Sequence, residues 1–406
     1  MIIRRRAIGI GFALTGVPLG MYFNYMFPVL QWSPVFMLLS VVLITHYSAL
    51  TKGRISTLSQ VLVFLTAYQF LMIFYGLISG EMTVQFFTFH LFAVALIFSL
   101  ASKKLTAEEL DDSIYWTFIL SGLCTLLGAY YLRGGLIVGE TAWYLRNENE
   151  DYALEIFTAS IAAIVNFTCI LYFPSSRNRV IHLLRYPMSI LCLYVIIFGG
   201  KRTPMLVTAV IFLFFMLKQK HINRSKIYIT VCAAILSASY LYGSNLEFQE
   251  TINETARNTY YGILNIFGNT KVSDETGSAS IRVESRIWAY TYIVENFSIL
   301  NYIFGAGYMT RWLDNPLLQS YLDMGLFGIF GYTLVILAYP IRVAFQRNLS
   351  NATLFALSLS VYGALSSINS GHPYMYIKYT PIIILASFLS TSKRKNTSLK
   401  LAEMPK

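Results

Sequence analysis

Long runs of apolar residues follow one another along most of the chain. Each run is roughly 20 residues long, the length that a helix needs to cross the hydrocarbon core of a bilayer. The runs do not alternate between apolar and polar positions as a half-buried strand would, and a helix satisfies its backbone groups internally. The pattern therefore predicts an all-α polytopic integral membrane protein.

About twelve runs can be counted, and each is expected to form a transmembrane helix. They lie near residues 7–25, 30–50, 57–79, 83–101, 113–132, 153–173, 183–199, 204–217, 226–243, 316–340, 352–370 and 375–391. This layout divides the chain into nine spans over 1–243, a large loop over 244–315, three spans over 316–391 and a basic tail over 392–406. Met1 leads through three arginines straight into the first run, which is expected to be an uncleaved anchor.

The composition agrees with a lipid environment. Hydrophobic residues make up 56% of the chain and charged residues 13%, whereas soluble domains carry about 25% charged residues. The net charge of +11 is explained by basic residues gathering in cytoplasmic loops, so no nucleic-acid partner is expected. The cysteines (Cys124, Cys169, Cys192 and Cys232) lie inside apolar runs at no metal-like spacing and are interpreted as packing residues.

The distribution of basic residues orients the chain. If Arg4–Arg6 lie in the cytoplasm, only ten of the 31 Lys and Arg residues fall on outer segments. These ten are Arg133, Arg146, Lys201, Arg202, Arg257, Lys271, Arg282, Arg286, Arg311 and Lys378. Because cytoplasmic loops carry the excess of basic residues, both termini are predicted to be cytoplasmic.

Two of the outer segments, 133–152 and 243–315, are long, and connections of this length are usually functional or disordered. Within the second, Ile281–Leu300 has a helical pattern rich in aromatic residues. Such a pattern indicates a helix lying at the membrane surface.

The short outer turn Gly199–Pro204 carries the first candidate for anion binding. Thr203 is predicted to cap the next helix, with Pro204 at its first position. Lys201 and Arg202 would then lie at the positive end of that helix, where a phosphate group binds favourably. A tight turn whose cations pair with lipid headgroups explains the same residues equally well.

Arg282 and Arg286 are the second candidate. They are four positions apart and share one face of the predicted helix, where like charges repel by about 0.2–0.5 kcal/mol. A bound anion, or Glu284 or Glu295 from a neighbouring turn, would compensate them, and guanidinium groups match the oxygens of a diphosphate. From the residues alone, a solvated helix face with local ion pairs is the favoured interpretation.

Asp314-Asn315-Pro316 precedes the tenth span. It has the pattern of an N-cap followed by proline at the first helical position. Asp314 could also act as a general base or an orienting carboxylate, and because a carboxylate beside arginines is a weak base, orientation is as good an interpretation as proton abstraction.

Three further outer residues have weaker claims. Arg133 ends a span and could join the anion site or reach the lipid headgroups. His372 and Tyr374 are interpreted as turn residues. The chain carries no Walker loop, zinc-binding helix or Asp-x-Asp pattern, so neither a metal nor a cofactor is expected.

These motifs together resemble the bacterial O-antigen polymerase and O-antigen ligase family (Wzy/WaaL-type polytopic membrane proteins). The match consists of an arginine in a short outer turn, an Arg-x-x-x-Arg or Arg-x-x-Trp element in a late outer loop, an Asn-x-x-x-Gly-x-Gly stretch, and an Asn-x-x-Leu stretch followed by glycines. Here these are Gly200–Thr203, Arg282–Trp288, Asn301–Gly307 and Asn315–Leu318 with Gly325 and Gly328. The matching part covers roughly 199–331, and the span layout fits the whole chain.

The resemblance implies a GT-C-like membrane fold and a metal-independent glycosyltransferase of lipopolysaccharide or other polysaccharide biosynthesis. The enzyme would transfer a glycan from undecaprenyl diphosphate onto a lipid-linked repeat unit at the periplasmic face of the inner membrane. A chain-length regulator and a flippase are the implied membrane partners. Ligases of the family carry histidine where this chain has Asp314, which favours the polymerase.

The resemblance also implies roles for individual residues. The donor diphosphate would be held by Arg202, Arg282 and Arg286, joined by Arg133 and Lys201. Arg286 would stabilise the charge that develops on the leaving diphosphate, and Asp314 or Glu284 would orient or deprotonate the acceptor hydroxyl.

Three alternatives stay open at this point. An O-antigen ligase would transfer the glycan to lipid A core. A lipid-linked oligosaccharide flippase or other transporter should carry charge deep within its spans, whereas the predicted spans hold almost none. A purely structural membrane protein would not need the outer arginines.

Overall fold

The computed structural model describes residues 4–27, 31–48, 59–137, 150–174, 179–199, 202–218, 278–346, 349–367 and 371–402, with scattered residues between 239 and 260. These residues form helices joined by turns and loops, and no strand occurs among them. Six of the helices are long and apolar enough to cross a membrane. The fold is therefore compatible with the predicted α-helical membrane protein.

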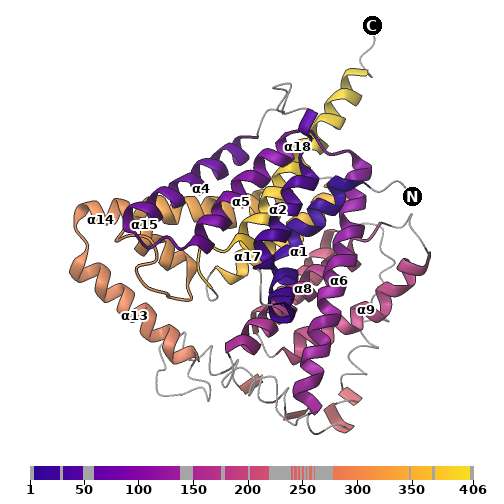
Figure 1. Cartoon of the computed structure of the whole chain (residues 1–406), viewed down its shortest axis with the longest axis horizontal. Coiled ribbons are helices and arrows are strands. Elements are labelled where there is room, and N and C mark those ends of the chain that lie inside the picture. Colours follow the sequence, from indigo (N-terminus) through magenta and orange to yellow (C-terminus); the bar gives the residue numbers. More distant parts are fainter. Residues whose placement is uncertain are drawn as a thin grey trace.

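The helices pack into one bundle (Figure 1). In chain order they are α1 (Arg5–Met26), α2 (Trp32–Ile44), α4 (Gln60–Ser79), α5 (Val84–Ala101), α6 (Ala107–Ile137), α8 (Glu150–Leu171), α9 (Arg179–Phe198), α10 (Arg202–Lys218), α13 (Ser278–Asn296), α14 (Ile299–Phe304), α15 (Pro316–Tyr332), the π-helix η1 (Thr333–Ala338), α16 (Tyr339–Ala344), α17 (Asn351–Ser366) and α18 (Tyr376–Ala402).

Each predicted span that the structure describes coincides in large part with a helix, although several helix ends differ from the predicted bounds. The ninth predicted span, 226–243, lies almost entirely outside the described residues. The last helix continues to Ala402, well beyond the predicted end of its span near residue 391. The six candidate spans comprise α1, α4, α5, α6, α9 and the run from α15 to α16.

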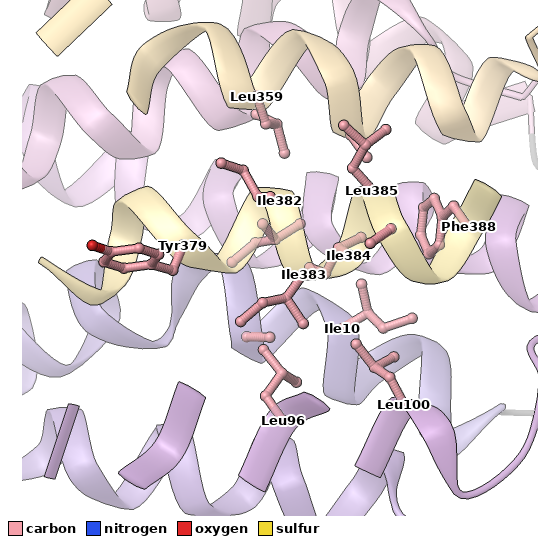
Figure 2. Close-up of a cluster of buried hydrophobic side chains, with 14 of the residues drawn as sticks. Ile10, Leu96, Leu100, Leu359, Tyr379, Ile382, Ile383, Ile384, Leu385 and Phe388 are labelled. Atoms are coloured by element: carbon pink, nitrogen blue, oxygen red, sulfur yellow. The ribbon is translucent and has the colours of Figure 1, made fainter. Parts of the chain in front are cut away.

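Helix α18 forms the centre of the bundle. Its residues from Ile382 to Leu385 and Phe388 are all fully buried, so this part of the helix is covered on every side. Figure 2 shows these side chains lying between Leu359 of α17 and Leu96 and Leu100 of α5. A helix that is apolar all round belongs in the interior of a bundle, and the rest of the fold is built around it.

Helix α4 shows the opposite pattern, with large apolar side chains facing outward. Val63, Phe70, Phe74 and Leu77 are each more than half exposed. They recur at helical spacing along one side, whereas Leu65 and Met72 are buried on the other. A continuous exposed apolar stripe of this kind is expected where a helix faces lipid.

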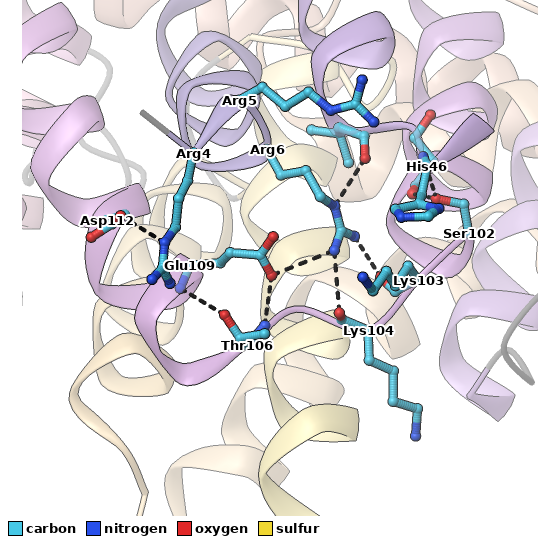
Figure 3. Close-up of polar contacts among 12 residues, drawn as sticks. Arg4, Arg5, Arg6, His46, Ser102, Lys103, Lys104, Thr106, Glu109 and Asp112 are labelled. Atoms are coloured by element: carbon cyan, nitrogen blue, oxygen red, sulfur yellow. Dashed lines mark hydrogen bonds and ion pairs between the residues drawn. The ribbon is translucent and has the colours of Figure 1, made fainter. Parts of the chain in front are cut away.

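One end of the bundle is held together by Arg6. Its side chain is only 4% exposed. Nε donates a hydrogen bond to the carbonyl of Ile44 at 3.0 Å and Nη1 donates to that of Lys104 at 3.2 Å. Nη2 donates to the carbonyl of Lys103, and the Glu109 carboxylate lies 3.5 Å from Nη1 (Figure 3). A single guanidinium therefore joins the ends of α2 and α5 to the start of α6.

Helix α13 stands apart from the bundle and reaches it through α14 and α15 (Figure 1). The predicted helix at Ile281–Leu300 is confirmed in outline, but it is two helices rather than one. Ser298 interrupts it and caps α14, accepting a hydrogen bond from the Asn301 amide at 3.3 Å. The chain turns at this point, so that both helices pack against α15.

The tenth predicted span is also interrupted. Gly325 lies inside α15 with φ 58° and ψ −145°, which is not a helical conformation. The run then continues as a π-helix at Thr333–Ala338 before α16 begins. π-helical turns and breaks of this kind often accompany functional sites.

Candidate functional site

Helix α13 places both of its arginines toward the protein. Ser285, Ala289 and Ile293 are buried and mark the side of the helix that packs on α15. Arg282 and Arg286 lie on that same side because they follow the same three- and four-residue spacing. The two guanidinium groups are partly buried as a result.

Glu284 does not join them. It is exposed, and two positions from Arg282 place it on the opposite side of α13. The structure thus separates this carboxylate from the arginines with which the sequence grouped it.

Asp314 supplies a carboxylate that faces Arg282. Its Oδ2 atom lies 3.6 Å from Nε of Arg282. Its Oδ1 atom accepts hydrogen bonds from the indole of Trp312 at 2.8 Å and from the amide of Gly371 at 3.3 Å. Three segments that are distant in the chain therefore converge on one side chain.

Asp314 does not cap α15. That role belongs to Asn315, whose Oδ1 atom accepts a hydrogen bond from the Leu318 amide at 3.1 Å, with Pro316 following at the first helical position. Asp314 itself has a φ of 51°, a left-handed conformation that is uncommon for a residue with a side chain. Such strain tends to occur at functional sites, and here it directs the carboxylate toward Arg282.

The loop before Asp314 is fixed by two glycines that meet α15. Gly305 has a φ of 80° and its backbone lies directly against that of Asp323 and Met324, leaving no room for a Cβ atom. A Cβ on Gly325 would lie 2.5 Å from the Ile303 carbonyl carbon. The two predicted glycine motifs are therefore halves of one backbone-to-backbone contact.

Asp323 anchors the same loop from inside α15. Its carboxylate is completely buried. Oδ1 accepts a hydrogen bond from the Thr310 amide at 3.1 Å, and Oδ2 accepts one from the Tyr374 hydroxyl at 2.7 Å. Both oxygens are thus occupied in holding together the two loops that carry Asp314 and His372.

The positive charges of Arg282 and Arg286 lie close enough to influence each other. Burial lowers the pKa of Arg286, and the neighbouring positive charge of Arg282 lowers it further. The Nε atom of Arg282 is buried and has no hydrogen-bond partner among the described residues. Two neighbouring guanidinium groups favour an anion at this place.

A second layer of polar residues lies behind Asp314. His372 is buried, and its Nδ1 atom accepts a hydrogen bond from the Tyr374 amide at 3.2 Å. Burial lowers the pKa of His372 to about 3, assisted by the charges of Lys378 and His90. The imidazole is therefore neutral at pH 7.

Lys378 belongs to this layer and interacts electrostatically with Asp314. It is 1% exposed, although it lies in the first turn of α18. The sequence showed it only as one of the outer basic residues. A lysine at the edge of an apolar run is a recognised sign of function, and this sign could have drawn attention to it.

Helix α5 connects the layer to the rest of the bundle. Phe86 packs edge-on against His372 with ring centroids 5.0 Å apart. One turn later, His90 contacts the Tyr308 hydroxyl at 3.1 Å through Nε2 and the Gln69 side chain at 2.7 Å through Nδ1. The far end of α5 meets Arg6, so the site and the Arg6 contacts lie at opposite ends of this helix.

The remaining predicted site residues are only partly described. Helix α10 begins at Arg202, so Thr203 and Pro204 lie within its first turn and the predicted cap at Thr203 is wrong by two residues. Lys201 and the side chain of Arg202 lie outside the described residues. Arg133 lies within α6, and its side chain is likewise outside them.

In the part of the chain that the structure describes, no three His, Cys, Asp or Glu side chains gather in a way that could hold a metal ion. The chain matches no protein-family model, and no curated protein sequence aligns with it significantly. Its function is therefore inferred from the site itself.

Proposed function

We propose that this protein is a polysaccharide polymerase of the O-antigen type. It would transfer a glycan from undecaprenyl diphosphate onto a lipid-linked repeat unit. The observation that supports this most directly is the arrangement of Arg282 and Arg286, which lie next to each other on one side of α13, with the Asp314 carboxylate 3.6 Å from Arg282. An excess of guanidinium groups at the end of a membrane bundle suits a lipid-linked diphosphate.

The reaction requires that charge be stabilised on the leaving group. The acceptor hydroxyl oxygen forms a bond to the anomeric carbon of the donor glycan, the bond from that carbon to the diphosphate oxygen breaks, and the hydroxyl proton is released. Negative charge grows on the departing diphosphate. Arg282 and Arg286 oppose this charge, and partial burial strengthens their effect because the local dielectric is low.

Asp314 has an orienting role in this scheme. Its Oδ1 atom already accepts two hydrogen bonds, while Oδ2 faces Arg282 at 3.6 Å. When a diphosphate binds Arg282, Oδ2 becomes available to accept a hydrogen bond from an acceptor hydroxyl. The hydroxyl is thereby held near the anomeric carbon.

The membrane arrangement is part of the proposal. It comprises twelve spans in a bacterial inner membrane, both termini in the cytoplasm, and the loop 244–315 in the periplasm. A periplasm-active reporter fused after Ser285 should be active. Activity of a cytoplasm-active reporter at that position would contradict the arrangement.

A transporter of lipid-linked oligosaccharide is the second candidate. The break in α15 at Gly325, beside the buried Asp323, favours it, because interrupted helices with buried carboxylates line many transport sites. Both oxygens of Asp323 are occupied by protein donors, however. This occupation fits a packing role better than a binding role.

Single alanine substitutions test the polymerase. Arg202, Arg282 and Arg286 are each replaced in a host lacking the gene, and the surface polysaccharide is separated on a gel. Arg342→Ala is the matched control, since Arg342 is an exposed arginine at the other end of the run from α15 to α16. Membrane levels of every variant are measured alongside.

The polymerase predicts that the ladder collapses to single repeats in the Arg282 and Arg286 variants and stays normal with Arg342→Ala. Loss of all attached glycan, with lipid-linked polymer accumulating, would indicate a ligase instead. Single-repeat lipid that accumulates on the cytoplasmic face would indicate the transporter. Normal ladders in all three site variants would contradict the site.

A further inference from the structure

Trp312 lies at the candidate site with a side chain that is both exposed and held in a fixed position. Its side chain is 49% exposed, yet it is held in place from two directions. The indole Nε1 atom donates a hydrogen bond to Oδ1 of Asp314 at 2.8 Å. The ring also lies against His372, with centroids 4.7 Å apart and planes 64° apart.

Trp288 is a nearby tryptophan whose ring is used for packing, and its contacts differ from those of Trp312. Its ring stacks on Tyr292 at 5.0 Å, and the Arg311 guanidinium lies 4.4 Å above it. It also packs against the buried cluster between α13 and α15. For Trp312, by contrast, no ring of the described residues stacks flat on it, since its contact with His372 is strongly tilted.

The position of Trp312 relative to the charges is equally specific. Trp312 and Arg282 approach opposite oxygens of the same Asp314 carboxylate. The exposed ring, the carboxylate and the guanidinium are therefore immediate neighbours. Because Asp314 has a strained backbone and His372 is buried, the base on which the ring rests is rigid.

A sugar ring matches this combination of groups. A pyranose presents C–H groups on its faces and hydroxyls around its edge. The faces pack on an exposed aromatic ring, and the hydroxyls bond to carboxylate and guanidinium groups beside it. Binding sites commonly join aromatic surface to a few fixed polar groups in this way.

We propose that Trp312 is the platform on which a sugar ring of the lipid-linked glycan stacks, with Asp314 accepting a hydrogen bond from a hydroxyl of that sugar. This rests on the proposed function and adds to it a sugar subsite next to the diphosphate-binding arginines. Trp312 was not among the site residues that the sequence indicated.

The test compares two ligands that differ only in their sugars. Full-length protein in lipid nanodiscs is titrated with undecaprenyl diphosphate, which has no glycan, and with the lipid-linked repeat unit purified from cells lacking the gene. The variants are Trp312→Ala, Trp312→Leu, Trp312→Phe and Arg282→Ala. Tyr186→Leu is the matched control, because Tyr186 is an exposed aromatic on α9, away from α13 and α15.

We expect Trp312→Ala to weaken binding of the glycan-bearing lipid about tenfold and to leave binding of undecaprenyl diphosphate unchanged. Trp312→Leu should behave in the same way, and it guards against a fold defect because it keeps apolar bulk. Trp312→Phe should retain most of the affinity, since an aromatic face remains. Arg282→Ala should weaken binding of both ligands, and Tyr186→Leu should weaken binding of neither.

The two proposals fail in different ways. If the wild-type protein binds both lipids and the Trp312 variants bind the glycan-bearing lipid normally, the sugar subsite is wrong and the diphosphate site stands. Equal weakening for both lipids also contradicts the subsite. If the wild-type protein binds neither lipid, the proposed function is wrong and the subsite with it.

Discussion

A Cβ atom on Gly325 would lie 2.7 Å from the backbone nitrogen of Gly305. The two glycines thus allow the loop before Asp314 to cross the interrupted helix α15 at the distance of a backbone contact. Backbone hydrogen bonds close the crossing, from the Ala306 amide to the Leu322 carbonyl at 2.8 Å and from the Gly307 amide to the Asp323 carbonyl at 3.1 Å. The position of Asp314 depends on this crossing.

Alanine at either glycine should therefore be costly. Both positions combine a positive φ with contact to backbone that cannot move aside. We expect Gly305→Ala and Gly325→Ala each to lower the free energy of unfolding by about 2–4 kcal/mol, measured by SDS titration of the purified protein.

Two other glycines serve as controls for these variants. A Cβ atom at Gly243 would meet nothing within 4 Å, so Gly243→Ala should leave the free energy of unfolding unchanged. A Cβ atom at Gly80 would also meet nothing, but Gly80 has a φ of 73°, so Gly80→Ala should lower the free energy of unfolding only through backbone strain. Wild-type stability in Gly325→Ala would show that the crossing is not tight.

The bond between Asp323 and Tyr374 should be measurable as a coupling energy. Tyr374→Phe removes a 2.7 Å hydrogen bond to a buried carboxylate, at a cost of about 1–3 kcal/mol. Asp323→Asn perturbs the same bond. The free energy of unfolding of the double variant should therefore decrease by less than the sum of the two single decreases.

Tyr172→Phe is the matched control for the tyrosine. Its hydroxyl is also buried and lies 2.9 Å from the Ser358 hydroxyl, but neither partner there is a carboxylate. It should therefore cost less. If the decreases in the free energy of unfolding for Asp323→Asn and Tyr374→Phe simply add in the double variant, the two side chains do not cooperate in holding the loops.

His372 predicts how stability depends on pH. Its pKa in the folded protein is lowered to about 3 by burial and by the charges of Lys378 and His90, whereas in the unfolded chain it is about 6.5. Below pH 6.5 the unfolded chain therefore binds a proton that the folded protein excludes. Above pH 6.5 His372 is neutral in both states and does not lower the free energy of unfolding. As the pH falls from 6.5 toward 3, the free energy of unfolding decreases by about 1 kcal/mol per pH unit.

SDS titrations at pH 7.5, 6 and 5 measure the effect. His372→Phe keeps an aromatic ring beside Phe86 but cannot titrate, so its stability should fall less between pH 7.5 and pH 5. An unchanged pH dependence in His372→Phe would assign the effect to another group.

Asn166 joins α8 to α6 by side-chain hydrogen bonds on the other side of the bundle. Its Nδ2 atom donates to the Phe118 carbonyl at 2.8 Å and to the Ser121 hydroxyl at 2.9 Å, joining α8 to α6. Asn166→Leu should lower the free energy of unfolding by about 1–2 kcal/mol. Thr168→Val is the control, because that hydroxyl bonds only within its own helix, to the Ile164 carbonyl.

The features that were predictable from the sequence are those set by local pattern. The apolar runs predicted the helices, and the four-residue spacing predicted that Arg282 and Arg286 lie on one side of α13. Asn315-Pro316 predicted the start of α15. The break at Gly325 was not predictable, because only its contact with a distant loop requires it.

The residues grouped around Asp314 were also hidden. His372 and Lys378 are separated from Asp314 by whole helices, whereas Trp312 is only two positions away, and single residues of these types have no pattern of their own. Glu284 shows the reverse error, since closeness in sequence suggested a partnership that the turn of the helix prevents.

The contacts of Arg6 bear on the order in which the protein is made. The carbonyl groups that it binds belong to residues 38, 97 and 98 positions further along the chain. When the first helix leaves the ribosome, none of these partners has been synthesised. Arg6 can form these bonds only after the turn that follows α5 has been synthesised, so α1 reaches its final position in the bundle only after α2, α4 and α5 have followed it.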